Sequence, residues 1–140
     1  MAHMNQEKKA KVAALVKPLL KKYGIKATLA VRNHMSLVLN IKSGSIDFIS
    51  NYVDTVRKLP GRTPNEDSLA LMIRSGYLDV NTYWYHEHFS GVAKKFLEEV
   101  LMAMKGADWY DRSDIQSDYF DTAYYVDINI GQWNKPYEVI

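Results

Sequence analysis

Apolar residues recur at three- and four-residue spacing in two stretches of the chain, residues 8–23 and 90–106. This spacing places them along one side of a helix, and it predicts two amphipathic helices. Gly24 and Gly106 stand where a helix-ending glycine is expected. The first stripe consists of Val12, Leu15, Val16, Leu19, Leu20 and Tyr23, and the second of Ala93, Phe96, Leu97, Val100, Leu101 and Met104.

Alternating apolar and polar residues predict four strands, at residues 25–32, 35–42, 77–84 and 123–130. Asn33 and His34 suit a two-residue hairpin between the first two strands, because asparagine tolerates positive φ. The expected fold is therefore α+β, with a mixed sheet of about four strands and two to three helices packed on one face.

Two further helices are predicted between the second and third strands. Ser45 can cap the first, which Pro60 ends, and Thr63 with Glu66 spells a capping box for a short second helix. Residues 69–73 also fit a buried strand. In the tail, residues 133–140, Pro136 argues against a central strand.

The chain of 140 residues has the size of one domain, which we expect to span residues 4–140. Residues 1–3 resemble a cloning remnant before Met4. The sequence contains no cysteine, which excludes disulfides and thiolate chemistry and favours a reducing compartment, by default the cytoplasm. No apolar run reaches the length of a membrane span, so we expect no membrane association and a monomer or small homo-oligomer.

The two halves of the chain differ in charge. Residues 1–70 carry 12 Lys or Arg against 5 Asp or Glu, whereas residues 71–140 carry 6 against 11. Such a division can steer a charged partner to one side of the molecule.

Two predicted strands share a sequence pattern, Tyr-Leu-Asp-Val-Asn at residues 77–81 and Tyr-Val-Asp-Ile-Asn at residues 125–129. Alternation places four polar residues on the face opposite the core: Asp79, Asn81, Asp127 and Asn129. Because a helix joins the strands, we expect them to be parallel, either adjacent or one strand apart. Adjacent strands would gather two carboxylates that favour a cationic partner, although an ordinary solvent-facing sheet looks the same in sequence.

Acidic and aromatic residues interleave between residues 108 and 122. Aromatic anchors with selecting carboxylates are typical of a protein interface, which predicts a partner protein with a basic surface. The alternative is a loop whose aromatics fold back on its own domain. The predicted partner-binding residues are Trp109, Tyr110, Asp111, Asp114, Asp118, Tyr119 and Asp121.

Two other chemistries need consideration. His86 and His88 could bind a metal, but histidines two apart share a face only in a strand. Together with the acidic cluster they would suit a metal-dependent hydrolase; this cluster is Asp108, Asp111, Asp114, Asp118 and Asp121. Four lysines on the first helix could contact nucleic acid, or simply form a solvated face: Lys11, Lys17, Lys21 and Lys22. Phosphate-loop, dinucleotide and serine-hydrolase motifs are missing, so we expect no cofactor and no catalytic residues.

Two stretches carry a resemblance to a known family: residues 77–84 and residues 113–137, which read Ser-Asp-x-x-x-Asp-Tyr-Phe-Asp-Thr-Ala-Tyr-Tyr-Val-Asp-Ile-Asn-Ile-Gly-Gln-Trp-Asn-Lys-Pro-Tyr. The chain resembles small uncharacterised proteins of bacteriophages and mobile elements, which are similar to large-polyvalent-protein-associated domains. The resemblance implies a protein that binds host or defence proteins. The leading function is therefore a non-enzymatic phage or mobile-element binding protein, an inhibitor of a host defence complex. The alternatives are a nucleic-acid-binding accessory protein and the metal-dependent hydrolase.

Overall fold

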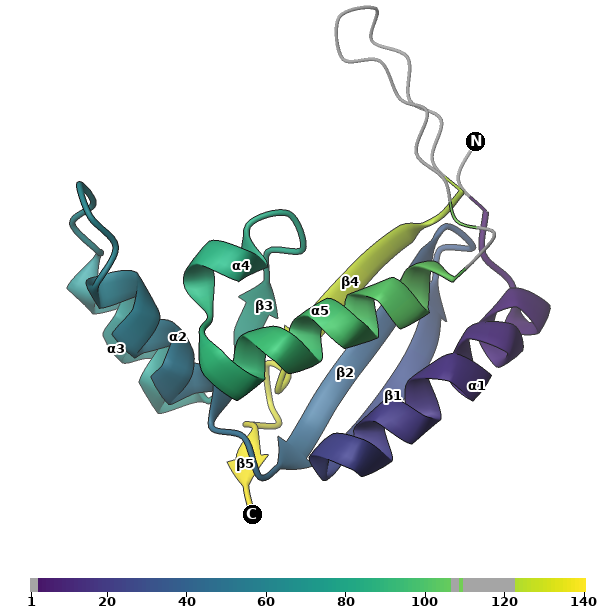
Figure 1. Cartoon of the computed structure of the whole chain (residues 1–140), viewed down its shortest axis with the longest axis horizontal. Coiled ribbons are helices and arrows are strands. Elements are labelled where there is room, and N and C mark those ends of the chain that lie inside the picture. The colour runs from purple at the N-terminus through teal and green to yellow at the C-terminus, as the bar shows by residue number, and fades with distance from the viewer. Residues whose placement is uncertain (1–2, 107–108, 110–122) are drawn as a thin grey trace, which may run out of the picture.

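The computed structural model describes residues 3–106, 109 and 123–140. In these residues the chain forms five helices and a five-stranded mixed sheet (Figure 1). The predicted α+β class with a mixed sheet is confirmed. The elements that the sequence did not predict are short, namely helix α4 (Tyr85–His88) and strand β5 (Glu138–Val139).

Helix α1 (Gln6–Tyr23) confirms the first predicted helix, and Gly24 ends it with a φ of 64°. Val12 and Val16 of its stripe are buried. Leu15, however, is 51% exposed, so the buried stripe is narrower than the spacing indicated.

Strands β1 (Ile25–Arg32) and β2 (Ser36–Gly44) form the predicted antiparallel hairpin. Asn33 and His34 have φ values of 54° and 56°, and the amide of Met35 donates to the carbonyl of Arg32 at 3.2 Å. Two consecutive residues with positive φ are what a tight hairpin turn requires, which confirms the position of the predicted turn. The predicted two-residue length is wrong, because Arg32 pairs with Ser36 and the connection therefore includes Met35.

Helices α2 (Phe48–Arg57) and α3 (Glu66–Ser75) begin later than predicted. The side chains of Asp47 and Asn65 each accept a first-turn backbone N–H at 3.1 Å. The predicted caps Ser45 and Thr63 are wrong, because a carboxylate and an amide nearer to each helix supply the capping oxygen. The strand alternative for residues 69–73 is also wrong.

Strand β3 (Leu78–Val80) is shorter than the predicted strand at residues 77–84. The side-chain oxygen of Asn81 accepts the backbone N–H groups of Tyr83 and Trp84 at 3.0 and 3.1 Å, so the chain turns there. Helix α4 follows, and then helix α5 (Gly91–Lys105), whose predicted apolar stripe is buried.

The strand order is β1-β2-β4-β3, with β5 paired to the end of β2. Strand β4 (Tyr125–Ile130) is parallel to β2 and antiparallel to β3. Adjacency of β3 and β4, one of the two expected arrangements, is confirmed, but the expected parallel direction is wrong. The physical reason is that residues 81–90 reverse the chain before α5 begins, so α5 returns it to the end of the sheet where β3 stops (Figure 1).

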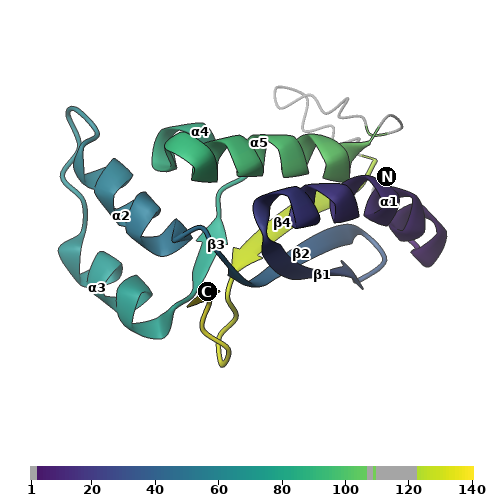
Figure 2. The same cartoon turned by 60° about the horizontal axis from the view of Figure 1, so that its bottom comes forward.

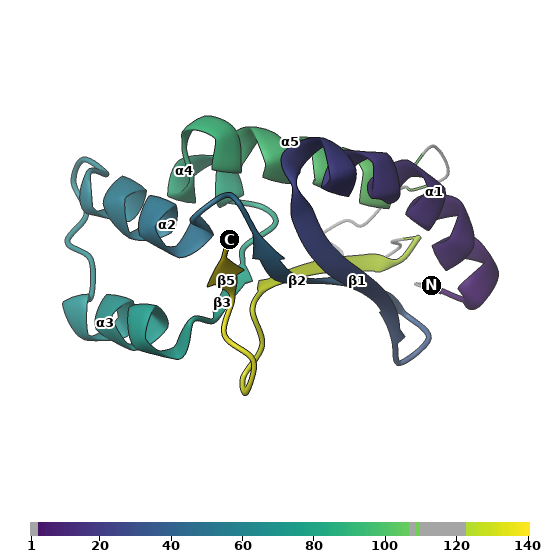
Figure 3. The same ribbon diagram turned by 90° about the horizontal axis from the view of Figure 1, so that it is seen from below.

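Helices α1 and α5 lie side by side over one face of the sheet, and α2 and α3 lie beyond its β3 edge (Figures 2 and 3). In the described part of the chain, no helix covers the opposite face of the sheet. One face of the sheet is therefore left without a helix over it in the described residues.

Candidate functional site

The uncovered side of the sheet is formed by every second residue of its strands. Leu39 and Ile128 point into the core with no exposed area, so their strand neighbours point the other way. We call this surface the open face. Its polar and aromatic members include Thr28 and Ser36, and those that form the candidate site are Arg32, Asn40, Asp79, Tyr125, Asp127 and Asn129.

An ion pair between Arg32 and Asp127 crosses the open face. Arg32 belongs to β1 and Asp127 to β4, so the side chains meet over β2, which separates the two strands. Arg32 is opposite Ser36, and Asp127 is opposite Val38. Ser36 and Val38 lie between the two partners of this ion pair, and they are only 8% and 5% exposed although they belong to the open face.

Asp79 of β3 lies opposite Asn129 of β4 on the same face. Partial burial raises the pKa of Asp79, and the nearby Asp127 carboxylate raises it further. The Arg32 guanidinium has the opposite effect and lowers this pKa. The amide of Asn129 donates to the side-chain oxygen of Asn40 at 3.1 Å. The open face thus holds two neighbouring carboxylates that share one guanidinium.

Replacement of Asp127 by asparagine is expected to lower the pKa of Asp79. The substitution removes the like charge that raises this pKa, and it frees Arg32, which already lowers it. A carboxyl-detected NMR titration of Asp79 in both proteins measures the change. Glu98→Gln on the outer side of α5 is the matched control and should leave the pKa unchanged; an equal shift there would contradict the assigned cause.

Two exposed aromatic residues lie at one end of the open face, where β4 begins and β3 ends. Tyr83 is 78% exposed and Tyr125 is 45% exposed. Both line a depression of about 170 Å³, together with Asp127 and Lys105. An aromatic wall beside a carboxylate suits a side chain that is apolar along its length and cationic at its end.

Trp109 belongs to the predicted acidic and aromatic loop and lines the same depression. Its indole N–H donates to the carbonyl of Tyr124 at 2.8 Å, and the Lys105 ammonium lies 4.5 Å from its ring centre. Trp109 is half-buried and packs against the core. For this residue, the arrangement agrees with the alternative in which the aromatics of the loop fold back on the domain.

The remaining predicted partner-binding residues lie outside the described part of the chain, namely Tyr110, Asp111, Asp114, Asp118, Tyr119 and Asp121. Among the predicted polar-face residues, Asp79, Asp127 and Asn129 meet on the open face, as strand alternation indicated. Asn81 does not, because β3 ends before it and its side chain caps the following turn.

His86 and His88 are in helix α4 rather than in a strand, so they point to different sides. The His88 ring packs against Tyr52 with centroids 5.6 Å apart, and burial lowers its pKa. His86 contacts the Trp84 and Tyr85 rings. Within the described residues, no group of three or more His, Asp or Glu side chains could hold a metal ion.

The α1 lysines that suggested nucleic acid are exposed: Lys11, Lys17, Lys21 and Lys22. Lys22 is paired with Glu99 at 3.4 Å, and Tyr23 donates to the same carboxylate at 2.6 Å. These lysines belong to the layer of helices, away from the open face.

Three open-face residues of the candidate site were missed by sequence reasoning, Arg32, Asn40 and Tyr125. Arg32 and Asn40 end or interrupt an apolar alternation and Tyr125 begins one, which is an ordinary pattern for a strand. Their role depends on β4 lying beside β2, which no local pattern indicates.

No helix in the described residues is long and apolar enough to cross a membrane. No protein-family model, curated protein or solved structure matched the chain.

Proposed function

We propose that this chain is a non-enzymatic binding protein that docks its open face on a partner protein with a basic surface. The observation that carries the proposal is the pair of carboxylates, Asp79 and Asp127, on a sheet face with no helix over it in the described residues. A cationic group from a partner would stabilise the ionised form of Asp79, which its surroundings now disfavour.

The composition of the open face supports this role. Arg32 holds Asp127 in place before a partner arrives, and Asn40 and Asn129 are held by their mutual hydrogen bond, so little side-chain freedom is lost on binding. Tyr83 and Tyr125 supply contact area beside the carboxylates, as aromatic anchors do in protein interfaces.

The partner we favour is a host protein, in particular a component of a host defence complex. This assignment is supported by the resemblance of residues 77–84 and 113–137 to small phage and mobile-element proteins. The open face constrains the chemistry of that partner, which should present Lys or Arg to Asp79.

The test begins by capturing partners of the wild-type chain from the natural host and purifying the strongest candidate. Its affinity is then measured for wild type, for Asp79→Lys and for Glu98→Lys, a matched reversal on α5. We expect Asp79→Lys to weaken binding by about tenfold or more, as one lost cross-interface charge pair does, and Glu98→Lys to have little effect. Equal affinities for all three proteins would reject the open face as the docking surface.

Two other results would support a different function. Binding of a labelled DNA or RNA that falls steeply with salt and is lost in Lys17→Glu/Lys21→Glu would support the nucleic-acid accessory role. A stoichiometric transition metal in protein purified without metal-chelating steps would support the metal-dependent hydrolase.

A further inference from the structure

Helix α3 lies at the periphery of the molecule, with one side against the body and the other free (Figures 1 and 3). Leu69 is buried and Met72 packs against the core, which defines the inner side. The opposite side contains four exposed residues at offsets of 0, 3, 4 and 7, a spacing that places them in one row. We call this row the α3 stripe: Asp67, Ala70, Leu71 and Arg74.

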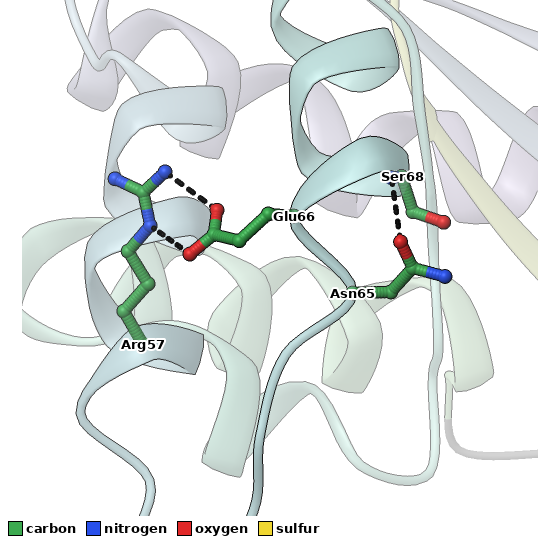
Figure 4. Close-up of polar contacts among 4 residues, drawn as sticks. All are labelled: Arg57, Asn65, Glu66 and Ser68. Atoms are coloured by element: carbon green, nitrogen blue, oxygen red, sulfur yellow. Dashed lines mark hydrogen bonds and ion pairs between the residues drawn. The ribbon is translucent and has the colours of Figure 1, made fainter.

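The α3 stripe is held in a defined orientation. Glu66 accepts two hydrogen bonds from the Arg57 guanidinium of α2, at 3.2 and 2.8 Å, and Asn65 caps the helix through the amide of Ser68 (Figure 4). At the other end, Gly76 ends the helix with a φ of 65°. A helix fixed at both ends presents its outer side in one direction, as a docking surface requires.

The charges and the apolar centre of the α3 stripe are complementary to the same stripe in reverse. Asp67 is in the first turn, Arg74 is in the last turn, and neither forms an ion pair with another described residue. Between them, Ala70 is small, whereas Leu71 is large and 54% exposed. The midpoint of the stripe falls between Ala70 and Leu71.

We propose that two copies of this chain associate through their α3 stripes, packed antiparallel about a two-fold axis. The axis passes the midpoint of the stripe, so Asp67 meets Arg74 of the second copy and Ala70 meets Leu71. Each contact then occurs twice, as in any isologous interface. The alanine lets the helices approach closely, and the leucine of one copy fills the space above the alanine of the other.

A second copy is the occupant that the stripe fits best. A partner surface whose charges all have the same sign would attract one end of the stripe and repel the other. A second α3 stripe in the reverse direction attracts both ends. The stripe spans only about 10 Å along a helix, from the rise of ~1.5 Å per residue. An interface of this size is small, and the dimer should be weak and form reversibly.

The α3 stripe lies outside the open face, so self-association is independent of the proposed function. A dimer would carry two open faces and bind a repeated or dimeric partner with greater avidity. Variants of the α3 stripe should leave the affinity of one open face unchanged.

Sedimentation velocity of the full chain, from micromolar concentrations to about 1 mM, tests the proposal over the range in which weak interfaces form. We expect a reversible monomer–dimer equilibrium for wild type. Asp67→Lys and Arg74→Glu should each weaken the dimer by about tenfold or more, because both symmetric ion pairs become repulsive. Glu98→Lys and Lys94→Glu, the matched reversals on α5, should leave it intact.

The decisive sample is an equimolar mixture of Asp67→Lys and Arg74→Glu. In a heterodimer of these two variants, the introduced lysine of one chain meets the introduced glutamate of the other, and the unchanged Arg74 meets the unchanged Asp67, so both attractive pairs return. We expect the mixture, and also the double variant Asp67→Lys/Arg74→Glu, to recover the dimer. A wild-type chain that stays monomeric at about 1 mM, or single variants that fail to complement each other, would overturn the antiparallel arrangement.

Discussion

Replacement of Phe48 by alanine is expected to lower the free energy of unfolding by about 3–5 kcal/mol, the range for a large aromatic removed from a packed core. Phe48 has no exposed area, and its ring lies 6.5, 5.7 and 5.6 Å from the rings of Phe89, Phe96 and Tyr137. It therefore joins the start of α2 to α5 and to the C-terminal residues. Urea denaturation followed by circular dichroism and tryptophan fluorescence measures the change.

Met102→Ala is the control for this prediction, because Met102 lies on the outer side of α5 and is 70% exposed. Its effect should stay within about 0.5 kcal/mol. If Phe48→Ala does not fold, Phe48→Leu preserves more of the volume and should lose less than the alanine variant. Equal stabilities of the Phe48 and Met102 variants would contradict the central position of Phe48.

Features that depend on local spacing could be predicted from the sequence. The stripes of α1 and α5 and the Asn33-His34 turn are set by residues within one or two turns of each other. Features that depend on distant residues could not. The antiparallel direction of β3 follows from the turn that Asn81 makes, and the position of β4 beside β2 follows from packing of the whole sheet.

The candidate site shows the same division. Alternation placed Asp79, Asp127 and Asn129 on the face away from the core, because side-chain direction in a strand is a local property. The ion pair of Arg32 with Asp127 joins residues far apart in sequence across a third strand. Strand order decides that contact, and helical or strand periodicity contains no information about strand order.

The C-terminal residues also differ from the expected tail. Tyr137 is 8% exposed, its hydroxyl donates to the carbonyl of Ile46 at 2.7 Å, and β5 adds to the end of β2. Pro136 indicated correctly that residues 133–140 contain no central strand. The C-terminal residues are nevertheless part of the core, because the buried ring of Tyr137 packs against Phe48.

Replacement of Gly131 by alanine is expected to destabilise the protein by about 2–4 kcal/mol, combining the cost of a left-handed backbone with a clash against fixed main chain. Gly131 has a φ of 73°, and a Cβ there would overlap the Gly76 carbonyl oxygen and lie 2.8 Å from the amide nitrogen of Tyr137. These two atoms share a hydrogen bond of 2.8 Å. The alanine must therefore displace either the end of α3 or the C-terminal residues.

Gly61→Ala separates the two causes, because Gly61 has a φ of 72° and a Cβ there would have no atom within 4 Å. That variant should show the backbone cost alone, about 1–2 kcal/mol. The excess at Gly131, measured by urea denaturation of both variants, reports the close packing where β4 ends against Gly76 and Tyr137. Equal losses at the two glycines would mean that the junction yields without cost, and that the C-terminal residues are held by Tyr137 and its bond to Ile46 instead.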